Sequence, residues 1–241
     1  MKKLGIVGGL GPMATVIFMK RIIDMTEASC DQEHIDMIVE HYPSIPDRTA
    51  YILDNKKENP LPRIREACRS LESAGAEIIA IPCVTAHYFH DSLTAAVNIP
   101  VMDGAALIAE YLSREKIGRV GIMATDGTVK SGIFSSAFEK SGAEIIYPDE
   151  ALQKYVMDLI YEDVKRGKPV EKEKFEAVSK ELFSKGADVI LLGCTELSVI
   201  AQEWLPAGRF LDVLDVLSME SVRYCGRLKA EHNILLRGDT L

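Results

Sequence analysis

The chain contains one segment twice, and each copy ends in a cysteine. Residues 71–83 read Leu-Glu-Ser-Ala-Gly-Ala-Glu-Ile-Ile-Ala-Ile-Pro-Cys, and residues 182–194 read Leu-Phe-Ser-Lys-Gly-Ala-Asp-Val-Ile-Leu-Leu-Gly-Cys. Equivalent positions lie 111 residues apart (194 − 83). Each copy predicts the end of a helix, a glycine turn, an acidic residue, a buried strand and a thiol. The chain is therefore constrained to fold into two related halves.

The rest of the chain alternates short apolar runs with amphipathic stretches. We expect strands at residues 4–7, 36–41, 77–81, 100–102, 120–124, 143–146, 189–192 and 210–211. Helices are expected at residues 13–26, 61–74, 105–114, 132–141, 151–166 and 171–185, after each repeated cysteine and at the C-terminus, with a loop at 43–59. Strands that alternate with helices favour parallel sheets covered on both faces.

These patterns predict an α/β fold with two related halves, each a parallel sheet flanked by helices. Residues 1–103 form the first half, residues 104–212 form the second, and residues 213–241 pack back on the first. Ligands of such sheets bind outside the carboxyl ends of the strands. We therefore expect the active site in the cleft between the halves, where both repeated cysteines lie.

Charge and cysteine content narrow the possible partners. The net charge of −8 argues against nucleic acid and anionic membranes. Five cysteines without a Cys-x-x-Cys pair indicate reduced thiols, which is typical of a cytoplasmic protein. Glycines interrupt the apolar stretch at residues 4–19, so we expect a strand, a turn and a helix there rather than a signal peptide. We expect no membrane span.

Cys83 and Cys194 are the main catalytic candidates, and each is closely followed by a threonine, Thr85 or Thr195. Amides at the start of a helix lower the pKa of a thiol. Thiols on both sides of a bound molecule suit a reaction that takes a proton from one face of a carbon and returns one to the other. The alternative is that the second thiol is only a relic of duplication. Buried, inert thiols are expected at the remaining cysteines, Cys30, Cys68 and Cys225.

The glycine-rich segment that contains Gly9, Leu10 and Gly11 has two interpretations. Its amides can approach a bound anion, or the glycines can simply form a tight turn between a strand and a helix. The segment also fits a loose dinucleotide fingerprint, which leaves a nicotinamide-dependent dehydrogenase as an alternative function. His87 and Glu196 follow the two cysteines, and each can exchange a proton with a thiol or hold it in place.

Two cations are candidates for binding an anionic substrate to this acidic protein. Arg48 follows a predicted strand in a loop, a position that suits a carboxylate clamp. Lys165 lies near the end of a predicted helix, where it can also act as a partner of the helix dipole.

Six motifs together resemble the aspartate/glutamate racemase family, and most closely its aspartate racemase branch. They are Gly8-Gly9-Leu10-Gly11-Pro12, Asp31-Gln32-Glu33-His34, Ile45-Pro46-Asp47-Arg48-Thr49-Ala50, Pro82-Cys83-Val84-Thr85-Ala86-His87, Ile160-Tyr161-Glu162-Asp163-Val164-Lys165 and Gly193-Cys194-Thr195-Glu196. The resemblance implies homodimers of two-domain α/β subunits that use neither pyridoxal phosphate nor a metal.

By the same resemblance, Cys83 and Cys194 are the two acid/base residues, and Thr85 and Thr195 lie beside them. Arg48 and Lys165 meet the carboxylates of a small acidic amino acid, and Gly9, Leu10, Gly11, Val84 and Glu196 complete the substrate site.

Val84 is the one departure from the family pattern, because the usual motif is Cys-Asn-Thr. The asparagine helps to hold the amino acid, and valine offers no hydrogen bond. A lost bond of this kind costs about 1–3 kcal/mol when its partner stays unpaired. A binding relative without catalysis, or an enzyme with altered specificity, is therefore the alternative to an aspartate or glutamate racemase. An isomerase or decarboxylase that uses one cysteine is another.

Overall fold

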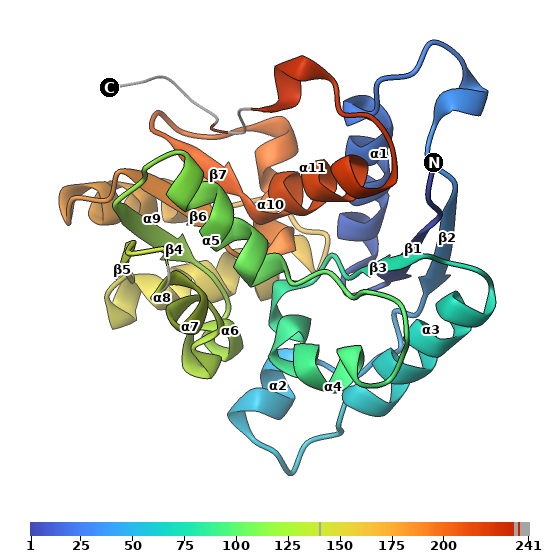
Figure 1. Cartoon of the computed structure of the whole chain (residues 1–241). Helices are drawn as coiled ribbons and strands as arrows, with labels where there is room; N and C mark the ends of the chain where they lie inside the picture. The colour runs from blue at the N-terminus through green and yellow to red at the C-terminus, as the bar shows by residue number, and fades with distance from the viewer. Residues whose placement is uncertain (140, 234–235, 237–241) are drawn as a thin grey trace.

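The computed structural model describes residues 1–139, 141–233 and 236, and it contains two parallel sheets (Figure 1). The three-stranded sheet has the order β2-β1-β3, and the four-stranded sheet has the order β5-β4-β6-β7. The strands are β1 (Leu4–Gly8), β2 (Met37–His41), β3 (Ile78–Ala80), β4 (Arg119–Met123), β5 (Glu144–Ile146), β6 (Val189–Leu192) and β7 (Phe210–Asp212). The predicted α/β fold with two parallel sheets is confirmed.

Helices connect and cover these strands. The α-helices are α1 (Pro12–Met25), α2 (Arg48–Leu53), α3 (Leu61–Ser73), α4 (His90–Thr94), α5 (Gly104–Arg114), α6 (Asp126–Ser131), α7 (Ile133–Phe138), α8 (Glu150–Asp158), α9 (Lys172–Ser184), α10 (Thr195–Glu203) and α11 (Val213–Cys225). Short 3₁₀ helices are η1 (Asp31–Glu33), η2 (Val84–Phe89) and η4 (Ala230–Asn233), and η3 (Leu159–Val164) is a π-helix. Side chains that accept backbone N–H bonds cap four helix starts: Asp47, Asp103, Thr125 and Asp212.

In each half, the repeated segment contains the end of a helix, a glycine turn and a strand. Gly75 and Gly186 both have the left-handed φ that favours glycine, +90° and +89°. The next acidic residue of each copy accepts a bond from the backbone at the start of the sheet. Glu77 accepts from Lys3 N at 2.8 Å, and Asp188 accepts from Arg119 N at 2.8 Å. In both halves, the acidic residue thus holds the start of the repeated strand against the start of the neighbouring strand.

The sequence predictions are wrong at several boundaries. The predicted loop at 43–59 contains α2, because the Asp47 side chain caps a helix there. The predicted helix at 132–141, whose Lys140 lies outside the described residues, is replaced by α6 and α7. Thr125 caps α6, and Gly132, with a φ of +68°, separates the two helices. The predicted strand at 100–102 is reduced to one bridge between Ile79 and Val101, because α5 begins directly after Asp103.

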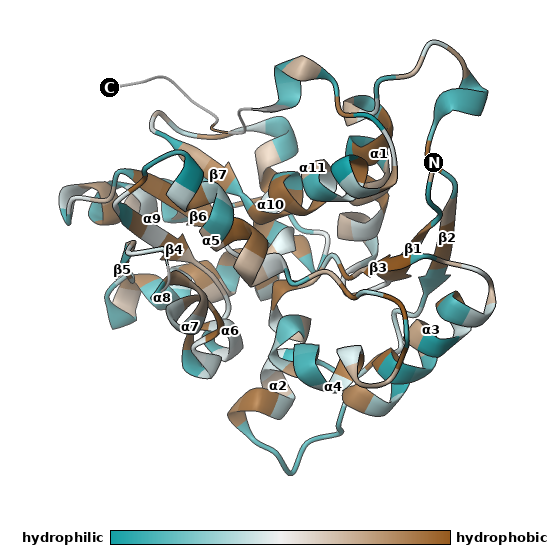
Figure 2. Cartoon of the chain, viewed as in Figure 1, coloured by the Kyte–Doolittle hydropathy of each residue, from teal (hydrophilic) through white to brown (hydrophobic). Residues whose placement is uncertain are grey.

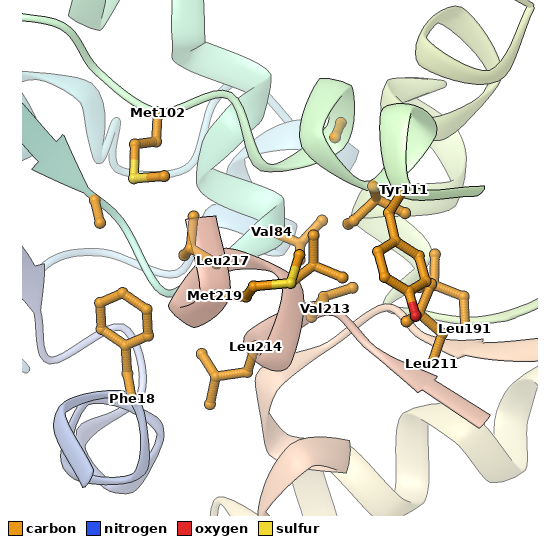
Figure 3. Packing of buried hydrophobic residues seen from close by; sticks show 14 of the residues in the cluster. Phe18, Val84, Met102, Tyr111, Leu191, Leu211, Val213, Leu214, Leu217 and Met219 are labelled. Atoms are coloured by element: carbon orange, nitrogen blue, oxygen red, sulfur yellow. The ribbon is translucent and has the colours of Figure 1, made fainter. Parts of the chain in front are cut away.

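Hydrophobic residues are concentrated in the strands and along parts of the helices (Figure 2), and many of them are buried. One buried cluster includes strand residues from both sheets, among them Ile6 and Leu191, together with side chains from α5 and α11. Figure 3 shows Val84 within this cluster, close to Leu214 and Leu217. A continuous core therefore joins the two sheets behind the carboxyl ends of their strands.

Helices α5 and α11 each pack on the half of the protein that they do not follow in sequence. Helix α5 follows Val101, the last residue paired with the three-stranded sheet, and α11 follows β7, the last strand of the four-stranded sheet. Helix α5 contacts α7, and α11 lies beside α1 (Figure 1). Arg21 of α1 pairs with Asp212 at 2.8 Å and with Asp215 of α11 at 3.0 Å, and all three side chains are buried.

The proposed division of the chain at residue 103 stays a prediction. Of the C-terminal segment 213–241, residues 234–235 and 237–241 lie outside the described residues. Across the described part of the chain, no helix is both long and apolar enough to cross a membrane.

Candidate functional site

A small cavity lies where strands of both sheets end, and its volume is about 10 Å³. This volume has room for about one water molecule, so the walls must move apart to admit a substrate. Its walls are formed by Leu10, Asp47, Arg48, Thr49, Cys83, Val84, Thr85, Thr125, Tyr161, Lys165, Cys194, Thr195 and Glu196. All predicted site residues line it except Gly9, Gly11 and His87. A wider groove along α5 and α7 is lined by His87 but by none of the other predicted site residues.

Cys194 is the residue immediately before α10, and its thiol is paired with a carboxylate from the same turn. The Cys194 Sγ donates to Glu196 Oε2 at 2.9 Å, and both residues are buried. Burial and the nearby Glu196 charge raise the pKa of the Cys194 thiol well above its usual value. Cys194 therefore carries its proton at neutral pH.

Cys83 precedes η2, and its neighbour is a cation instead. The guanidinium of Arg48 lies beside the Cys83 thiol. Burial disfavours the charge of Arg48, but Cys83, Asp47 and Glu196 outweigh this effect, so the pKa of Arg48 is raised. The Cys83 thiol therefore has a positively charged neighbour, whereas the Cys194 thiol has a negatively charged one.

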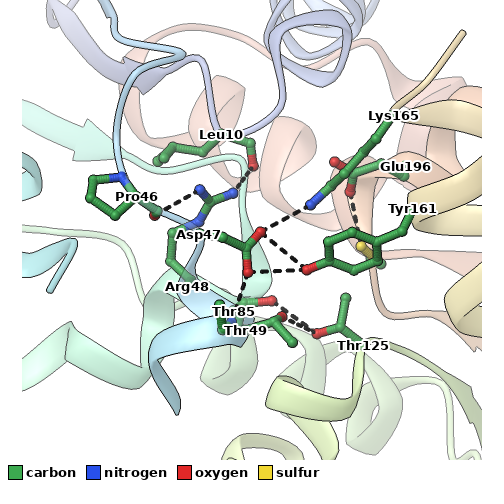
Figure 4. A network of polar contacts seen from close by, with 12 residues as sticks. Leu10, Pro46, Asp47, Arg48, Thr49, Thr85, Thr125, Tyr161, Lys165 and Glu196 are labelled. Atoms are coloured by element: carbon green, nitrogen blue, oxygen red, sulfur yellow. Dashed lines mark hydrogen bonds and ion pairs between the residues drawn. The ribbon is translucent and has the colours of Figure 1, made fainter. Parts of the chain in front are cut away.

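Arg48 is held by backbone carbonyls rather than by a carboxylate of the protein (Figure 4). Its Nη2 donates to Leu10 O at 3.2 Å, and its Nη1 donates to Pro46 O at 3.2 Å. The buried Nε has no hydrogen-bond partner among the described residues. The guanidinium is thus oriented in advance and keeps a donor for another molecule.

Lys165, which follows η3, also lines the cavity and forms an ion pair with Asp47. The Lys165 ammonium lies 3.4 Å from Asp47 Oδ2, and the Tyr161 hydroxyl donates to the two Asp47 oxygens at 3.1 and 3.2 Å (Figure 4). Burial raises the pKa of Tyr161 to about 12, so its hydroxyl stays protonated. The long Lys165–Asp47 contact leaves the ammonium able to turn to a substrate carboxylate.

Gly9 and Gly11 allow other parts of the chain to lie close to the backbone of this turn. Gly9 has a φ of +91°, and a Cβ there would lie 2.5 Å from the backbone of Tyr42. A Cβ on Gly11 would lie 2.9 Å from Glu196 Oε1. Gly9 therefore forms a tight turn, and Gly11 makes room for the carboxylate that holds Cys194.

His87 is directed to the start of α5. Its Nδ1 accepts from Gly104 N at 3.2 Å, and its Nε2 lies 3.3 Å from Ile81 O. Burial lowers the pKa of His87 to about 4, so the imidazole is neutral at pH 7. Of the two predicted thiol partners, Glu196 contacts a thiol in this structure, whereas His87 supports the fold.

Sequence reasoning did not select four of the cavity residues, Asp47, Thr49, Thr125 and Tyr161. Asp47, Thr49 and Tyr161 stand inside motifs that carried the family resemblance, and Thr125 follows a strand, so a signal existed for all four.

The remaining cysteines lie away from the cavity. Cys68 and Cys225 are buried as predicted, but Cys30 is exposed in the loop before η1, so the prediction for Cys30 is wrong. All five cysteines are unpaired. Within residues 1–139, 141–233 and 236, no three His, Cys, Asp or Glu side chains are grouped to hold a metal ion.

Comparison with known proteins gives concordant matches. The family model described as Asp/Glu/Hydantoin racemase matches residues 7–217. The broad specificity amino-acid racemase RacX of Bacillus subtilis is 27% identical over 209 residues, which cover 82% of this chain and 86% of that protein.

Solved structures also match over most of the chain. The aspartate racemase of Picrophilus torridus superimposes with a TM-score of 0.83 at 30% identity and covers 96% of this chain and 98% of its own. A glutamate racemase of Francisella tularensis in complex with D-glutamate has a TM-score of 0.65 at 19% identity, covering 92% of this chain and 80% of its own, and shares the fold.

Proposed function

This chain belongs to the family of Asp/Glu/hydantoin racemases, which are isomerases, and from that premise we propose that it racemises a small acidic amino acid with two cysteines and no cofactor. The observation that carries the proposal is the pair of thiols in one cavity, Cys83 beside a guanidinium and Cys194 beside a carboxylate. The two thiols thus differ in the charge next to them, as a base and an acid must.

In the proposed mechanism, Cys83 starts as the thiolate and Cys194 as the thiol. Cys83 removes the α-proton from one face of the substrate, and Cys194 delivers its own proton to the opposite face. The C–H electron pair stays on the α-carbon between the two transfers and forms the new C–H bond. After one turnover Cys83 is the thiol and Cys194 the thiolate, so the next turnover can run in the opposite direction without a cofactor.

Arg48 and Lys165 supply the charge that the reaction needs. An α-proton next to a carboxylate is weakly acidic, so the carbanion-like state must be stabilised. The oriented Arg48 fork, with its unused Nε, is proposed to bind the α-carboxylate. Lys165 is proposed to leave Asp47 for the side-chain carboxylate, and the Asp47 carboxylate is then available to the substrate ammonium.

The proposal of aspartate as the substrate is supported by two cavity cations and by likeness to the Picrophilus torridus aspartate racemase. Glutamate is the alternative within the same class. Val84 favours a second candidate, an enzyme of altered specificity or a binding relative, since it presents an apolar side chain to the cavity. The family resemblance further supports a homodimeric, cytoplasmic enzyme, and sedimentation equilibrium tests the dimer.

Incubation with single enantiomers in deuterium oxide tests the proposed function. Without pyridoxal phosphate and with a chelator present, L-aspartate and D-aspartate should each acquire deuterium at Cα and lose optical activity. Proton NMR and polarimetry measure the two processes. Exchange that requires an added cofactor would contradict the mechanism, and no exchange with aspartate, glutamate or neutral amino acids would favour the binding relative.

A further inference from the structure

Four buried threonine hydroxyls gather at one side of the cavity. Thr49 and Thr85 come from α2 and η2, and Thr125 and Thr128 come from the segment that follows β4. All four side chains belong to residues that are buried. Figure 4 shows Thr49, Thr85 and Thr125 next to one another. The group joins chain segments that belong to different sheets.

Three of these hydroxyls form a closed ring. The Oγ1–Oγ1 distances are 3.3 Å for Thr85–Thr125, 2.9 Å for Thr85–Thr128 and 3.1 Å for Thr125–Thr128. Thr49 donates to Thr125 at 3.1 Å. Each hydroxyl has one proton, so these contacts use the donors of all four groups. The ring is therefore satisfied internally and acts as a connection between segments.

The ring is attached to the turn that carries Cys83. Thr85 lies two residues after Cys83 in η2, a 3₁₀ helix of six residues. Hydrogen bonds of 3₁₀ helices have poorer geometry than those of α-helices, and such helices depend on their surroundings. Cys194 instead immediately precedes α10, an α-helix of nine residues. The Cys83 turn needs external support more than the Cys194 turn does.

Thr128 gives this support without lining the cavity. Thr128 is 1% exposed, and among the residues that the structure describes its hydroxyl bonds to those of Thr85 and Thr125. The Ser131 hydroxyl donates to the Thr128 backbone carbonyl. The cavity walls include Thr85 and Thr125 but not Thr128. We infer that Thr128 is a positioning residue. From α6, which follows β4 of the four-stranded sheet, it holds Thr85 and so fixes Cys83 for proton transfer. The inference rests on the proposed racemase function.

Thr128→Val tests the inference, with Thr128→Ser as the matched control. Valine keeps the volume and removes the hydroxyl, whereas serine keeps the hydroxyl. We expect kcat to fall about tenfold in the valine variant, as for one lost hydrogen bond, with KM nearly unchanged. The serine variant should retain most of the wild-type kcat. If the valine variant does not fold, Thr128→Ala removes the same hydroxyl with a smaller side chain.

Isotope effects separate positioning from a general loss of stability. The α-deuterium of one enantiomer is taken by Cys83 and that of the other by Cys194. If Cys83 alone is displaced, the primary isotope effect should rise for the first enantiomer and fall for the second. A purely structural role would lower the melting temperature and leave both isotope effects at the wild-type values, which would overturn the inference.

A second measurement does not depend on catalysis. Alkylation by iodoacetamide, followed by peptide mass spectrometry, gives the rate at Cys83 relative to Cys194. This ratio should change several-fold in Thr128→Val and return in Thr128→Ser. An unchanged ratio contradicts the positioning role. If the wild type exchanges no α-proton with any amino acid, the proposed function fails, and the alkylation ratio alone decides the role of Thr128.

Discussion

The two cysteine turns descend from one repeated segment but differ in how their chemistry is assembled. At the repeat offset of 111 residues, Thr85 corresponds to Glu196, and Val84 corresponds to Thr195. In the Cys194 turn, the group that contacts the thiol comes from the same helix, two residues away. In the Cys83 turn, the nearby cation and the supporting hydroxyls come from distant segments.

This difference suggests how a duplicated site can become asymmetric. A racemase needs a base and an acid at the same moment, so two identical turns would compete for one proton. Glu196 stands where the other copy has Thr85 and places a carboxylate against Cys194, while Arg48 lies beside Cys83. The carboxylate beside Cys194 thus comes from the same helix, whereas the guanidinium beside Cys83 comes from a distant segment.

Replacement of each thiol tests the comparison with the largest expected effect. Cys83→Ser and Cys194→Ser should each lower racemisation by about a thousandfold or more, because a serine hydroxyl is a far poorer base than a thiolate. Each variant should still exchange the α-proton of one enantiomer, and the two variants should retain opposite enantiomers. Polarimetry and deuterium incorporation followed by NMR measure both properties.

Cys30→Ser is the control for these variants, since Cys30 is exposed outside the cavity and should tolerate the change. If either cavity variant racemises at the wild-type rate, that cysteine is not a catalytic base. If both variants retain exchange of the same enantiomer, the two turns do not serve opposite faces.

Acid should destabilise the Cys83 turn in particular. His87 corresponds to Ser198 at the repeat offset, so only one copy has a titratable group at this position. Burial lowers the pKa of His87 to about 4, below its unfolded value near 6.5. Stability from the neutral imidazole is therefore complete above about pH 6.5 and is lost as the pH falls towards 4.

We expect a drop from pH 7 to pH 5 to lower the free energy of unfolding through His87 by about 2 kcal/mol. His87→Asn can keep both hydrogen bonds without titrating, so its stability should depend less on pH over this range. Urea unfolding at several pH values gives the difference. His41→Gln, at an exposed position, is the control, and equal pH slopes for wild type and His87→Asn would refute the expectation.

Val84 gives the smallest expected effect and separates the two turns by polarity. Thr195 presents a hydroxyl where Val84 presents only methyl groups. Val84→Asn should raise kcat/KM for aspartate about tenfold, the equivalent of one recovered hydrogen bond. The same change should lower stability, because Val84 also packs in the apolar cluster. Steady-state kinetics with aspartate and alanine measure the preference, and lower activity on aspartate would identify Val84 as a specificity residue for less polar amino acids.

The repeat and the strand–helix alternation were sufficient to predict the fold class. The glycine turns, the acidic residues after them and the buried strands form one local unit, so adjacent residues contain the information. The errors lie where a helix cap or a tertiary contact determines where an element begins or ends. Asp47 starts a helix inside a proline-rich loop, and a single bridge at Val101 replaces a predicted strand because α5 begins directly after it.

Site residues were predictable where a strand end or a motif marked them, as for Cys83, Cys194, Arg48 and Lys165. Their proposed roles stay predictions. The threonine ring was not predictable, because it joins segments far apart in the chain. The partner of His87 was likewise hidden, since a histidine four residues after a cysteine can face the thiol or the core.

The packing of α5 and α11 affects how the chain folds. We expect that neither half can bury its apolar surface alone, because α5 packs against α7 of the second half and α11 packs against α1 of the first. Detachment of α11 from α1 would also separate Arg21 from Asp215, one of its two carboxylate partners. The two copies should therefore unfold together in one cooperative transition, and a fragment that contains one copy should not be stable. The duplication that gave this chain two thiols also made its halves dependent on each other.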